Sequence, residues 1–345
     1  MTQSDLCPIL EECQACTQMK MSVADQQTRK KEWVEGRLCH PVGEFVPSPK
    51  ALGYRARASF RPNAHGVLGY YRPRSHEHVE VDCCVLLRPE LNRILGALPP
   101  TPDLQSVELR TGGAGVVLSA WKRGDSRATR KDLMALRCSS LEQLGLMGVA
   151  LNGQKVWGQI HVELHVGMVE HHLGPKSFYQ VNLDINEALV NRVGAWVERL
   201  EATQVLDLYA GVGNLSLPIA KRGVPVTLVE REKEATKDAK NTIARQGKEW
   251  TVSLMPGNAD AYTAGDAFFD VAILDPPRKG APGVMDQLML TRPRGVIVVS
   301  CNPVALARDV RPALEKGYQI ADLVVFDMFP QTEHAEVLCV LTPGN

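Results

Sequence analysis

The chain has 345 residues, of which 44% are hydrophobic and 23% are charged. This composition is too apolar for a disordered chain, and the length predicts roughly two domains, each large enough to bury its own core. Lysine and arginine together number 39, as do aspartate and glutamate, so the formal net charge is zero. The neutral total excludes a uniformly basic chain of the kind that binds nucleic acid by charge alone, but it does not exclude a local basic patch.

The nine cysteines are an odd number, and the polar N-terminal residues do not have the pattern of a secretory signal peptide. No run of about 18 uninterrupted apolar residues occurs, so we expect no membrane-spanning segment. Both features predict a cytoplasmic protein with reduced thiols. Reduced cysteines that cluster in the sequence indicate metal binding or catalysis.

Three segments are predicted along the chain, at 1–40, 41–175 and 176–345. The first carries several cysteines and then a polar stretch that is typical of a helix. The second contains short strands and turns, including a hairpin expected at 107–109 and 116–121. These two segments predict a smaller, β-rich part of the molecule.

From residue 176 the pattern changes to strands that alternate with helices. Helices are expected at 181–200, 215–222, 233–246 and 305–315, and strands at 204–210 and 224–230 and within 251–259, 268–278 and 294–303. This alternation predicts an α/β fold with a mainly parallel sheet covered on both faces. The last apolar runs, 318–327 and 335–342, have no helix between them, so they should pair antiparallel at one edge.

A glycine turn, DLYAGVGN at 207–214, lies between a predicted strand and a predicted helix. Glycines let the backbone approach a ligand closely, and Glu230, at the end of the next strand, can accept hydrogen bonds from ribose hydroxyls. Ser216 replaces the third glycine of the dinucleotide motif, and Asp207 would repel a pyrophosphate. The turn therefore favours S-adenosylmethionine, a cationic nucleoside without phosphate, over a turn with no ligand.

Two further side chains follow strands at the edge where ligands bind in such sheets. Asn258 follows the third strand, and Asp275 begins the loop DPPRKG at 275–280 after the fourth. The paired prolines stiffen this loop, which helps to hold a planar base. Loops of this kind also occur in amino-group methyltransferases.

Cys301 follows a strand in SCNP at 300–303, and Glu336 begins the last strand. An exposed thiolate is a strong nucleophile, whereas most buried cysteines only pack. A final strand inserted near the fifth would bring Glu336 close to Cys301 as a general base. The pair suits uracil: thiolate addition to carbon 6 activates carbon 5 for methylation, and a base must then remove the carbon-5 proton before the thiolate leaves.

These motifs, with SFYQVN at 177–182 and FDMFPQTEHAEV at 326–337, resemble the RNA uracil-5 methyltransferases over most of the chain. The resemblance implies a class I S-adenosylmethionine-dependent methyltransferase fold, Rossmann-like with an antiparallel edge hairpin. It implies Cys301 as the nucleophile and Glu336 as the base that abstracts the proton. It places Phe178 near the target base, against the alternative of a core aromatic. The resemblance also implies that Gln180 and Tyr209 line the cofactor site. With the residues of the glycine turn and of the strand ends, the expected cofactor-binding residues are Gln180, Tyr209, Gly211, Asn214, Glu230, Asn258 and Asp275.

The N-terminal cysteines add a second match. The resemblance implies that Cys7, Cys13, Cys16 and Cys84 hold a 4Fe–4S cluster, as in the ribosomal-RNA branch, although thiolates suit zinc equally well on chemical grounds. Cys83 is an alternative fourth ligand. The cysteines follow the start closely, as in the shorter 23S rRNA enzymes without a TRAM β-barrel, while Gln331 stands where relatives often have histidine. A tRNA enzyme and a non-catalytic iron–sulfur RNA-binding or ribosome-assembly protein are the alternatives.

No acidic residue occurs between Phe45 and His76. This stretch interleaves basic with aromatic residues: Lys50, Arg55, Arg57, Arg61, Arg72 and Arg74 with Tyr54, Phe60, Tyr70 and Tyr71. Basic groups meet phosphates and aromatic rings stack on unpaired bases, so the pattern predicts RNA binding within 41–175, against the alternative of core aromatics on a solvated sheet. A ring carbon can be attacked only when the base leaves its stack, so a flipped or single-stranded uridine is expected. The protein is expected to be a monomer.

Overall fold

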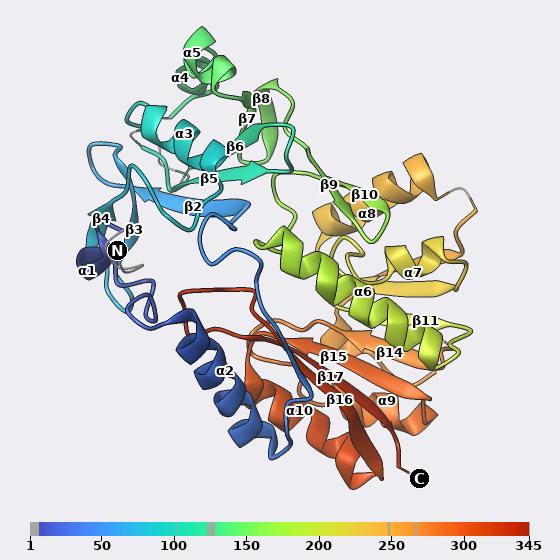
Figure 1. Cartoon of the computed structure of the whole chain (residues 1–345). Helices are drawn as coiled ribbons and strands as arrows, with labels where there is room; N and C mark the ends of the chain where they lie inside the picture. The colour runs from blue at the N-terminus through green and yellow to red at the C-terminus, as the bar shows by residue number, and fades with distance from the viewer. Residues whose placement is uncertain are drawn as a thin grey trace.

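The computed structural model describes residues 7–344, apart from residues 102, 123, 125–127, 248 and 266–267. A large sheet forms the lower half of the molecule in Figure 1, and a second, smaller sheet forms the upper half. The large sheet has the strand order β1-β16-β17-β15-β14-β11-β12-β13 in the described chain. Its strands are β1 (Glu44–Val46), β11 (Val205–Leu208), β12 (Val226–Glu230), β13 (Val252–Pro256), β14 (Val271–Leu274), β15 (Gly295–Ser300), β16 (Tyr318–Phe326) and β17 (Glu336–Pro343).

Helices cover both faces of the large sheet because its central strands are apolar on both sides. Ile273 and Ile297 pack into one core, while their neighbours Leu274 and Val298 pack into the other. The first face is covered by α6 (Leu183–Arg199), α7 (Leu217–Lys221) and α8 (Lys233–Gln246). The second is covered by α2 (Val23–Leu38), α9 (Val284–Thr291) and α10 (Pro303–Glu315). This is the doubly wound α/β architecture that the alternation predicts.

The last two long strands pair antiparallel, as expected, and β17 lies between β16 and β15. They do not form the edge, however, because the three-residue strand β1 pairs in parallel with β16 outside them. Helix α2, just before β1, lies along this end of the sheet in Figure 1. The edge strand of the sheet therefore comes from residues 44–46, far in sequence from its neighbour β16.

The smaller sheet has the order β4-β3-β2-β5-β6-β7-β8 among the described residues. Helix α3 (Pro89–Ala97) packs against it, while α1 (Leu10–Cys13), α4 (Arg130–Met134) and α5 (Ser139–Gln143) are short. Its strands are β2 (Arg57–Pro62), β3 (Leu68–Tyr71), β4 (His78–Glu80), β5 (Ser106–Thr111), β6 (Val116–Trp121), β7 (Leu146–Leu151) and β8 (Gln154–Gly158). The hairpin expected at 107–121 is the antiparallel pair β5–β6.

A separate ribbon of two antiparallel strands, β9 (Val162–Val166) and β10 (Val169–Leu173), joins the two halves. Its buried residues belong to the core of the large sheet. The division at residues 40 and 175 therefore stays a prediction, since β1 and this ribbon pack with the C-terminal half. Within the described residues, none of the helices combines the length and the apolar character that a bilayer crossing requires.

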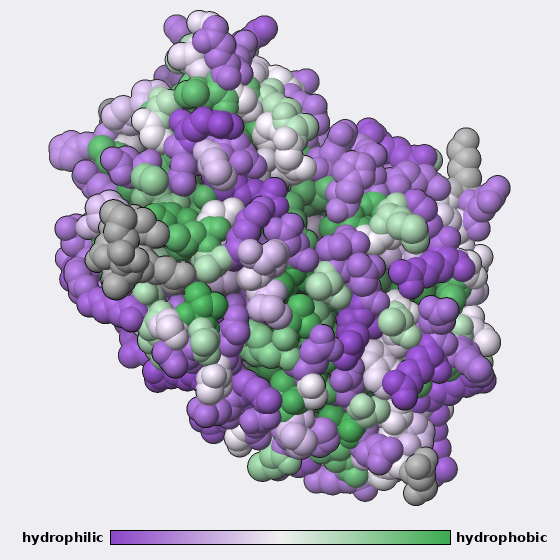
Figure 2. Space-filling model, in the orientation of Figure 1, coloured by the Kyte–Doolittle hydropathy of each residue, from purple (hydrophilic) through white to green (hydrophobic). Residues whose placement is uncertain are grey.

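Hydrophilic residues cover most of the face seen in Figure 2, and apolar residues gather toward its middle and lower part. The two halves meet in this middle region. The cavity described below is lined by residues of the large sheet and of the segment that follows β10.

Candidate active site

A cavity of about 690 Å³ lies at the carboxyl ends of β11, β12, β14 and β15. This edge of a doubly wound sheet is where ligands bind in such folds. All nine residues proposed from the sequence for catalysis and cofactor binding line it. They are Gln180, Tyr209, Gly211, Asn214, Glu230, Asn258, Asp275, Cys301 and Glu336.

The glycine turn after β11 has the backbone that the sequence indicates. Gly211 and Gly213 adopt φ values of 57° and 80°, and Tyr209 also lies in the left-handed region at 64°. A Cβ on Gly213 would lie 2.5 Å from the Leu217 side chain, so only glycine fits without a shift. Gly211 lines the cavity, whereas Gly213 lets the turn pack closely on Leu217.

Glu230, at the end of β12, has a fixed carboxylate. One oxygen accepts a hydrogen bond from the Gly211 amide at 2.8 Å, and the other accepts from the Glu232 amide at 2.7 Å. Each oxygen retains a further lone pair. Glu230 therefore both braces the glycine turn and offers acceptors to a ligand in the cavity.

Polar side chains that follow β11 and β13 form a hydrogen-bonded network at the cavity. The Tyr209 hydroxyl donates to Asp260 at 2.5 Å, and Lys279 pairs with the same carboxylate at 2.8 Å. Asn258 caps the short helix η2 (Ala259–Ala261), accepting from the Asp260 amide at 3.2 Å. The side-chain amide of Asn214 is instead paired reciprocally with that of Asn186, at 2.9 Å in each direction. Asn214 thus lines the cavity with an amide that already has partners within the chain.

Cys301 and Glu336 are brought together by strand pairing. β15 and β17 pair antiparallel, with Ser300 opposite Val337. Cys301 follows Ser300 and Glu336 precedes Val337, so the antiparallel register brings Cys301 opposite Glu336. Glu336 is only 3% exposed. Asn302 fixes the turn after Cys301 by donating to the Arg278 carbonyl at 2.9 Å. The insertion of the last strand beside β15, expected from the sequence, is confirmed.

Asp275, Glu336 and Cys301 are ionisable groups that lie close together and are shielded from solvent. Burial raises the pKa of Asp275 to about 7, and burial together with Asp275 raises the pKa of Glu336 well above its usual value. Burial and these two carboxyl groups raise the pKa of Cys301 to about 11, while Arg278 lowers it. Such shifts favour a cationic ligand, because positive charge would compensate the buried carboxylates.

The thiols of Cys7, Cys13, Cys16 and Cys84 lie at a second place in the molecule, beside β3 and β4. Cys7, Cys16 and Cys84 pack around Met19, Tyr54 and Leu86. Burial raises the pKa of Cys16 to about 12, and the thiols of Cys84, Cys13 and Cys7 add to the effect. Among the described residues, no three of these sulfur atoms lie within 4.8 Å of one another. In the part of the chain that the structure describes, the thiols influence one another electrostatically without forming a compact group of three.

The comparisons with known proteins agree with this geometry. The chain is 31% identical to a 23S rRNA (uracil(1939)-C(5))-methyltransferase RlmD of Erwinia tasmaniensis, over 97% of this chain and 81% of that protein. It is 30% identical to the protein of the same name from Salmonella typhimurium, over 96% and 80%. The family model for tRNA (uracil-5-)-methyltransferase matches residues 258–343, and that for the methyltransferase small domain matches 178–290.

The chain belongs to the RNA uracil-5 methyltransferase family. The solved structure of Pyrococcus abyssi tRNA (uracil-54, C5)-methyltransferase with S-adenosyl-L-homocysteine has the same fold. It superimposes with a TM-score of 0.78, covering 95% of this chain and 86% of that one, at 24% identity. The class I S-adenosylmethionine-dependent methyltransferase fold, implied by the resemblance, is thereby confirmed.

The basic and aromatic stretch of this uracil-5 methyltransferase is only partly on the surface. Tyr54 and Phe60 are buried, and Tyr70 stacks on Phe60 with 5.1 Å between ring centroids, so these rings belong to the core rather than to a stacking surface. Tyr71 is 43% exposed. Phe178, expected near the target base with a core position as the alternative, is 62% exposed at the cavity, and the Arg57 guanidinium lies 5.5 Å from its ring centroid.

Some lining residues were not singled out from the sequence. Phe329 and Arg278 line the cavity, and each sits inside a motif that was noticed for another residue. Asp260 has no such motif, and only the structure pairs it with Tyr209. Asp207 is buried and does not line the cavity; burial raises its pKa to about 8, against a lowering effect of the Ser216 hydroxyl.

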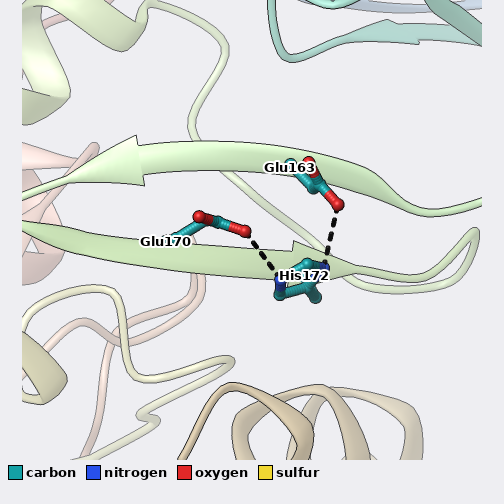
Figure 3. Close-up of side chains that lie close together, drawn as sticks. All are labelled: Glu163, Glu170 and His172. Carbon is teal, nitrogen blue, oxygen red and sulfur yellow. Dashed lines mark ion pairs between the residues drawn. The ribbon is translucent and has the colours of Figure 1, made fainter. Parts of the chain in front are cut away.

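A different group of acidic and histidine side chains lies on the β9–β10 ribbon (Figure 3). His172 lies between Glu170, at 2.9 Å, and Glu163, at 3.5 Å. The Arg245 guanidinium of α8 is within 3.2 Å of both imidazole nitrogens. Because Arg245 already contacts both imidazole nitrogens, we assign the group to docking the ribbon on α8 rather than to holding a metal.

Proposed function

We propose that this protein methylates carbon 5 of a specific uridine in 23S ribosomal RNA, using S-adenosylmethionine. The observation that carries the proposal is the pairing of β15 with β17, which sets the Cys301 thiol against the Glu336 carboxyl in one cavity. The curated relatives, at about a third identity over most of their length, carry this activity in their names.

The cavity fits the proposed cofactor. The glycine backbone at Gly211 and the acceptor Glu230 suit an adenosine, and the buried carboxyl groups suit a positive sulfonium. Gln180, Tyr209, Asn214, Asn258 and Asp275 complete its proposed contacts. When bound, S-adenosylmethionine supplies the methyl group as an electrophile.

The chain's own residues then carry the uracil chemistry. The Cys301 thiolate adds to carbon 6, and the electron pair of the 5,6 double bond moves to make carbon 5 nucleophilic. After carbon 5 has gained the methyl group, the Glu336 carboxylate removes its proton. The electrons of that C–H bond re-form the double bond and expel the Cys301 thiolate. Arg278 lowers the pKa of the Cys301 thiol, so it favours the thiolate both before the addition step and after the elimination step.

The thiols of Cys7, Cys13, Cys16 and Cys84 are the proposed ligands of a 4Fe–4S cluster. Thiolates suit zinc as well as iron–sulfur clusters on chemical grounds, and the resemblance to the ribosomal-RNA branch favours the cluster. Cys84 is preferred to Cys83, because Cys83 is exposed whereas Cys84 packs with Cys7 and Cys16 and its backbone is held by Asn92. Methyl transfer needs no electron from the cluster. We therefore assign the proposed cluster a structural role, which is to order the N-terminal segment.

The β-rich half is the proposed RNA-holding part. Arg57, on β2, reaches the exposed Phe178 at the cavity, which connects that half with the place of chemistry. A base entering the cavity must be flipped or single-stranded. We expect a cytoplasmic monomer, organised as a cluster segment, an RNA-binding part and a catalytic part at 1–40, 41–175 and 176–345.

The test is a pair of variants assayed with 23S RNA and methyl-labelled cofactor. Cys301→Ala should lower turnover by about three orders of magnitude or more, because the nucleophile is lost. Glu336→Gln should leave a methylated RNA covalently attached to protein in denaturing electrophoresis. The exposed Cys39 offers a matched control, and Cys39→Ser should keep full activity.

Retained turnover in Cys301→Ala would remove the mechanism, and absence of the adduct in Glu336→Gln would remove the base assignment. The RNA substrate is decided by mapping 5-methyluridine in a strain that lacks the protein. Loss from transfer RNA alone would reject the ribosomal substrate. Inactivity of the metal-loaded protein on every RNA would favour a binding or assembly role.

A further inference from the structure

The loop between β16 and β17, residues 327–335, is held by the N-terminal part of the chain. It carries Phe329 into the cavity and leads directly to Glu336. Three consecutive carbonyls of this loop accept hydrogen bonds from residues of the first 54. Phe329 accepts from Lys30 Nζ at 3.0 Å, Pro330 from the Tyr54 hydroxyl at 3.1 Å, and Gln331 from the Gln18 amide at 3.0 Å.

Lys30 also anchors the start of the loop. Its ammonium group is 2.7 Å from Asp327 Oδ1, and the two side chains are 0% and 4% exposed. Burial lowers the pKa of Lys30, while Asp327 raises it. A buried pair of this kind tolerates the loss of one partner poorly, because the other charge is left uncompensated. The pair therefore fixes where the chain leaves β16.

Gln26 holds the middle of the loop through a reciprocal amide pair. Its Oε1 accepts from the Gln331 backbone amide at 2.9 Å, and its Nε2 donates to Gln331 Oε1 at 3.0 Å. Gln331 is fully buried and has a φ of 71°, in the left-handed region that is unfavourable for a residue with a Cβ. Such a conformation persists only where its surroundings impose it, and here Gln26 does so.

We propose that Gln26 and Lys30 are positioning residues for Glu336, acting through the loop 327–335. The inference rests on the function proposed above. Proton transfer depends steeply on distance, and Glu336 is the first residue after this loop. Cys301 is fixed separately, by the bonds of Asn302 to Arg278 and to Ser300. Loosening the loop should thus slow proton abstraction more than thiolate addition.

The prediction distinguishes a positioning role from a merely structural one. In Gln26→Leu and Lys30→Met, the methylated covalent RNA adduct should accumulate, because it forms but breaks down slowly. Turnover should fall about tenfold, and the KM for RNA should change less than about twofold. With RNA deuterated at carbon 5 of the target uridine, the isotope effect on turnover should be larger than in the wild type.

The experiment is a single-turnover assay with the full chain, quenched in denaturant, which measures adduct and free product over time. Asp322→Asn is the matched control. Asp322 accepts from Trp196 at 2.7 Å and from Arg192 at 3.0 Å on the same strand β16, away from the cavity. This control should lower the melting temperature without adduct accumulation. Melting temperatures show which variants fold, and Gln26→Leu, which removes no charge, serves if Lys30→Met does not.

The positioning role would be overturned if, relative to the wild type, the rates of adduct formation and of product release fell by the same factor in the variants. An unchanged isotope effect in Gln26→Leu would overturn it as well. The proposed function fails in a different way. In that case wild-type protein and Glu336→Gln would themselves form no adduct. A wild type that turns over and a Glu336→Gln enzyme that traps RNA, beside a Gln26→Leu enzyme of wild-type behaviour, would reject only the inference.

Discussion

Asp275 and Glu336 line the cavity, and Asp207 is buried behind its lining. Burial raises the pKa values of all three carboxyl groups. Asp275 adds to the shift of each of the other two. A protein keeps such groups together when a ligand compensates them. The site is therefore electrostatically incomplete until a cation enters it.

The affinity for a sulfonium should accordingly depend on pH. Because the pKa of Asp275 is about 7 and that of Asp207 about 8, these groups are protonated near pH 6 and ionised above pH 8. Negative charge in the site thus grows as the pH rises. We expect the ratio of affinities for S-adenosylmethionine over uncharged S-adenosylhomocysteine to grow about tenfold between pH 6 and 8.5, about 1.4 kcal/mol.

Titration calorimetry with both ligands at the two pH values measures this ratio. In Asp275→Asn the growth should be smaller, because one titrating carboxyl group is gone. A ratio that stays constant with pH in the wild-type protein would contradict the electrostatic account of the site.

At the scale of elements, the segment from β10 to α6 is clamped from both halves of the molecule. The Asp238 carboxylate of α8 accepts from the Gly174 amide and from the Ser177 hydroxyl, each at 2.6 Å. Arg110 of β5 donates to the carbonyls of the same two residues, at 3.1 and 2.6 Å. Ser177, Phe178 and Gln180 of this segment line the cavity.

Asp238→Ala should therefore weaken both the fold and the cofactor site. Two hydrogen bonds to a buried carboxylate are lost, so we expect a decrease of about 3 kcal/mol in the free energy of unfolding and a lower affinity for S-adenosylmethionine. Urea denaturation and titration calorimetry measure the two effects. Lys240→Ala, at an exposed position of the same helix, should change neither. An Asp238→Ala protein with wild-type stability would show that the clamp is unimportant.

The sequence predicted the elements with strong local signals and missed those defined by distant partners. Apolar runs separated by helical patterns placed β11, β12, β14 and β15, and motif residues at their ends placed Glu230, Asp275 and Cys301. β1 is only three residues long, and its position depends on pairing with β16, 280 residues further along the chain, so no local pattern indicates it. The aromatic residues Tyr54 and Phe60 were ambiguous because alternation alone does not say which face of a small sheet is covered.

At the scale of the whole molecule, the thiols and the catalytic loop share neighbours. Tyr54 packs among Cys7, Cys16 and Cys84, and its hydroxyl reaches the carbonyl of Pro330. A metal group at these thiols would thus order a segment that contacts both halves. The sequence alone could not reveal this contact, because it joins residues far apart in the chain.

Loss of the metal should affect the entire fold. Protein purified without oxygen should be brown and contain iron, and Cys84→Ser should lose most of the iron and several degrees of melting temperature. Cys83→Ser is the matched control, at an exposed neighbouring thiol, and should retain both. Metal analysis, visible absorbance and thermal denaturation provide the readouts. A colourless protein with stoichiometric zinc would refute the cluster, and iron loss in Cys83→Ser alone would exchange the fourth ligand.

The amide pair between Gln26 and Gln331 also has a meaning for the order of folding. Its partners are 305 residues apart, so an unfolded chain must close nearly its full length to form it. We expect contacts of this separation to form late, after the local strand and helix pairs of the large sheet. The glycine turn and Glu230 at β11 and β12 are close in sequence, whereas the approach to Glu336 is set by the two ends of the chain meeting. We therefore expect the protein to become able to bind the nucleoside before it becomes able to complete turnover during folding.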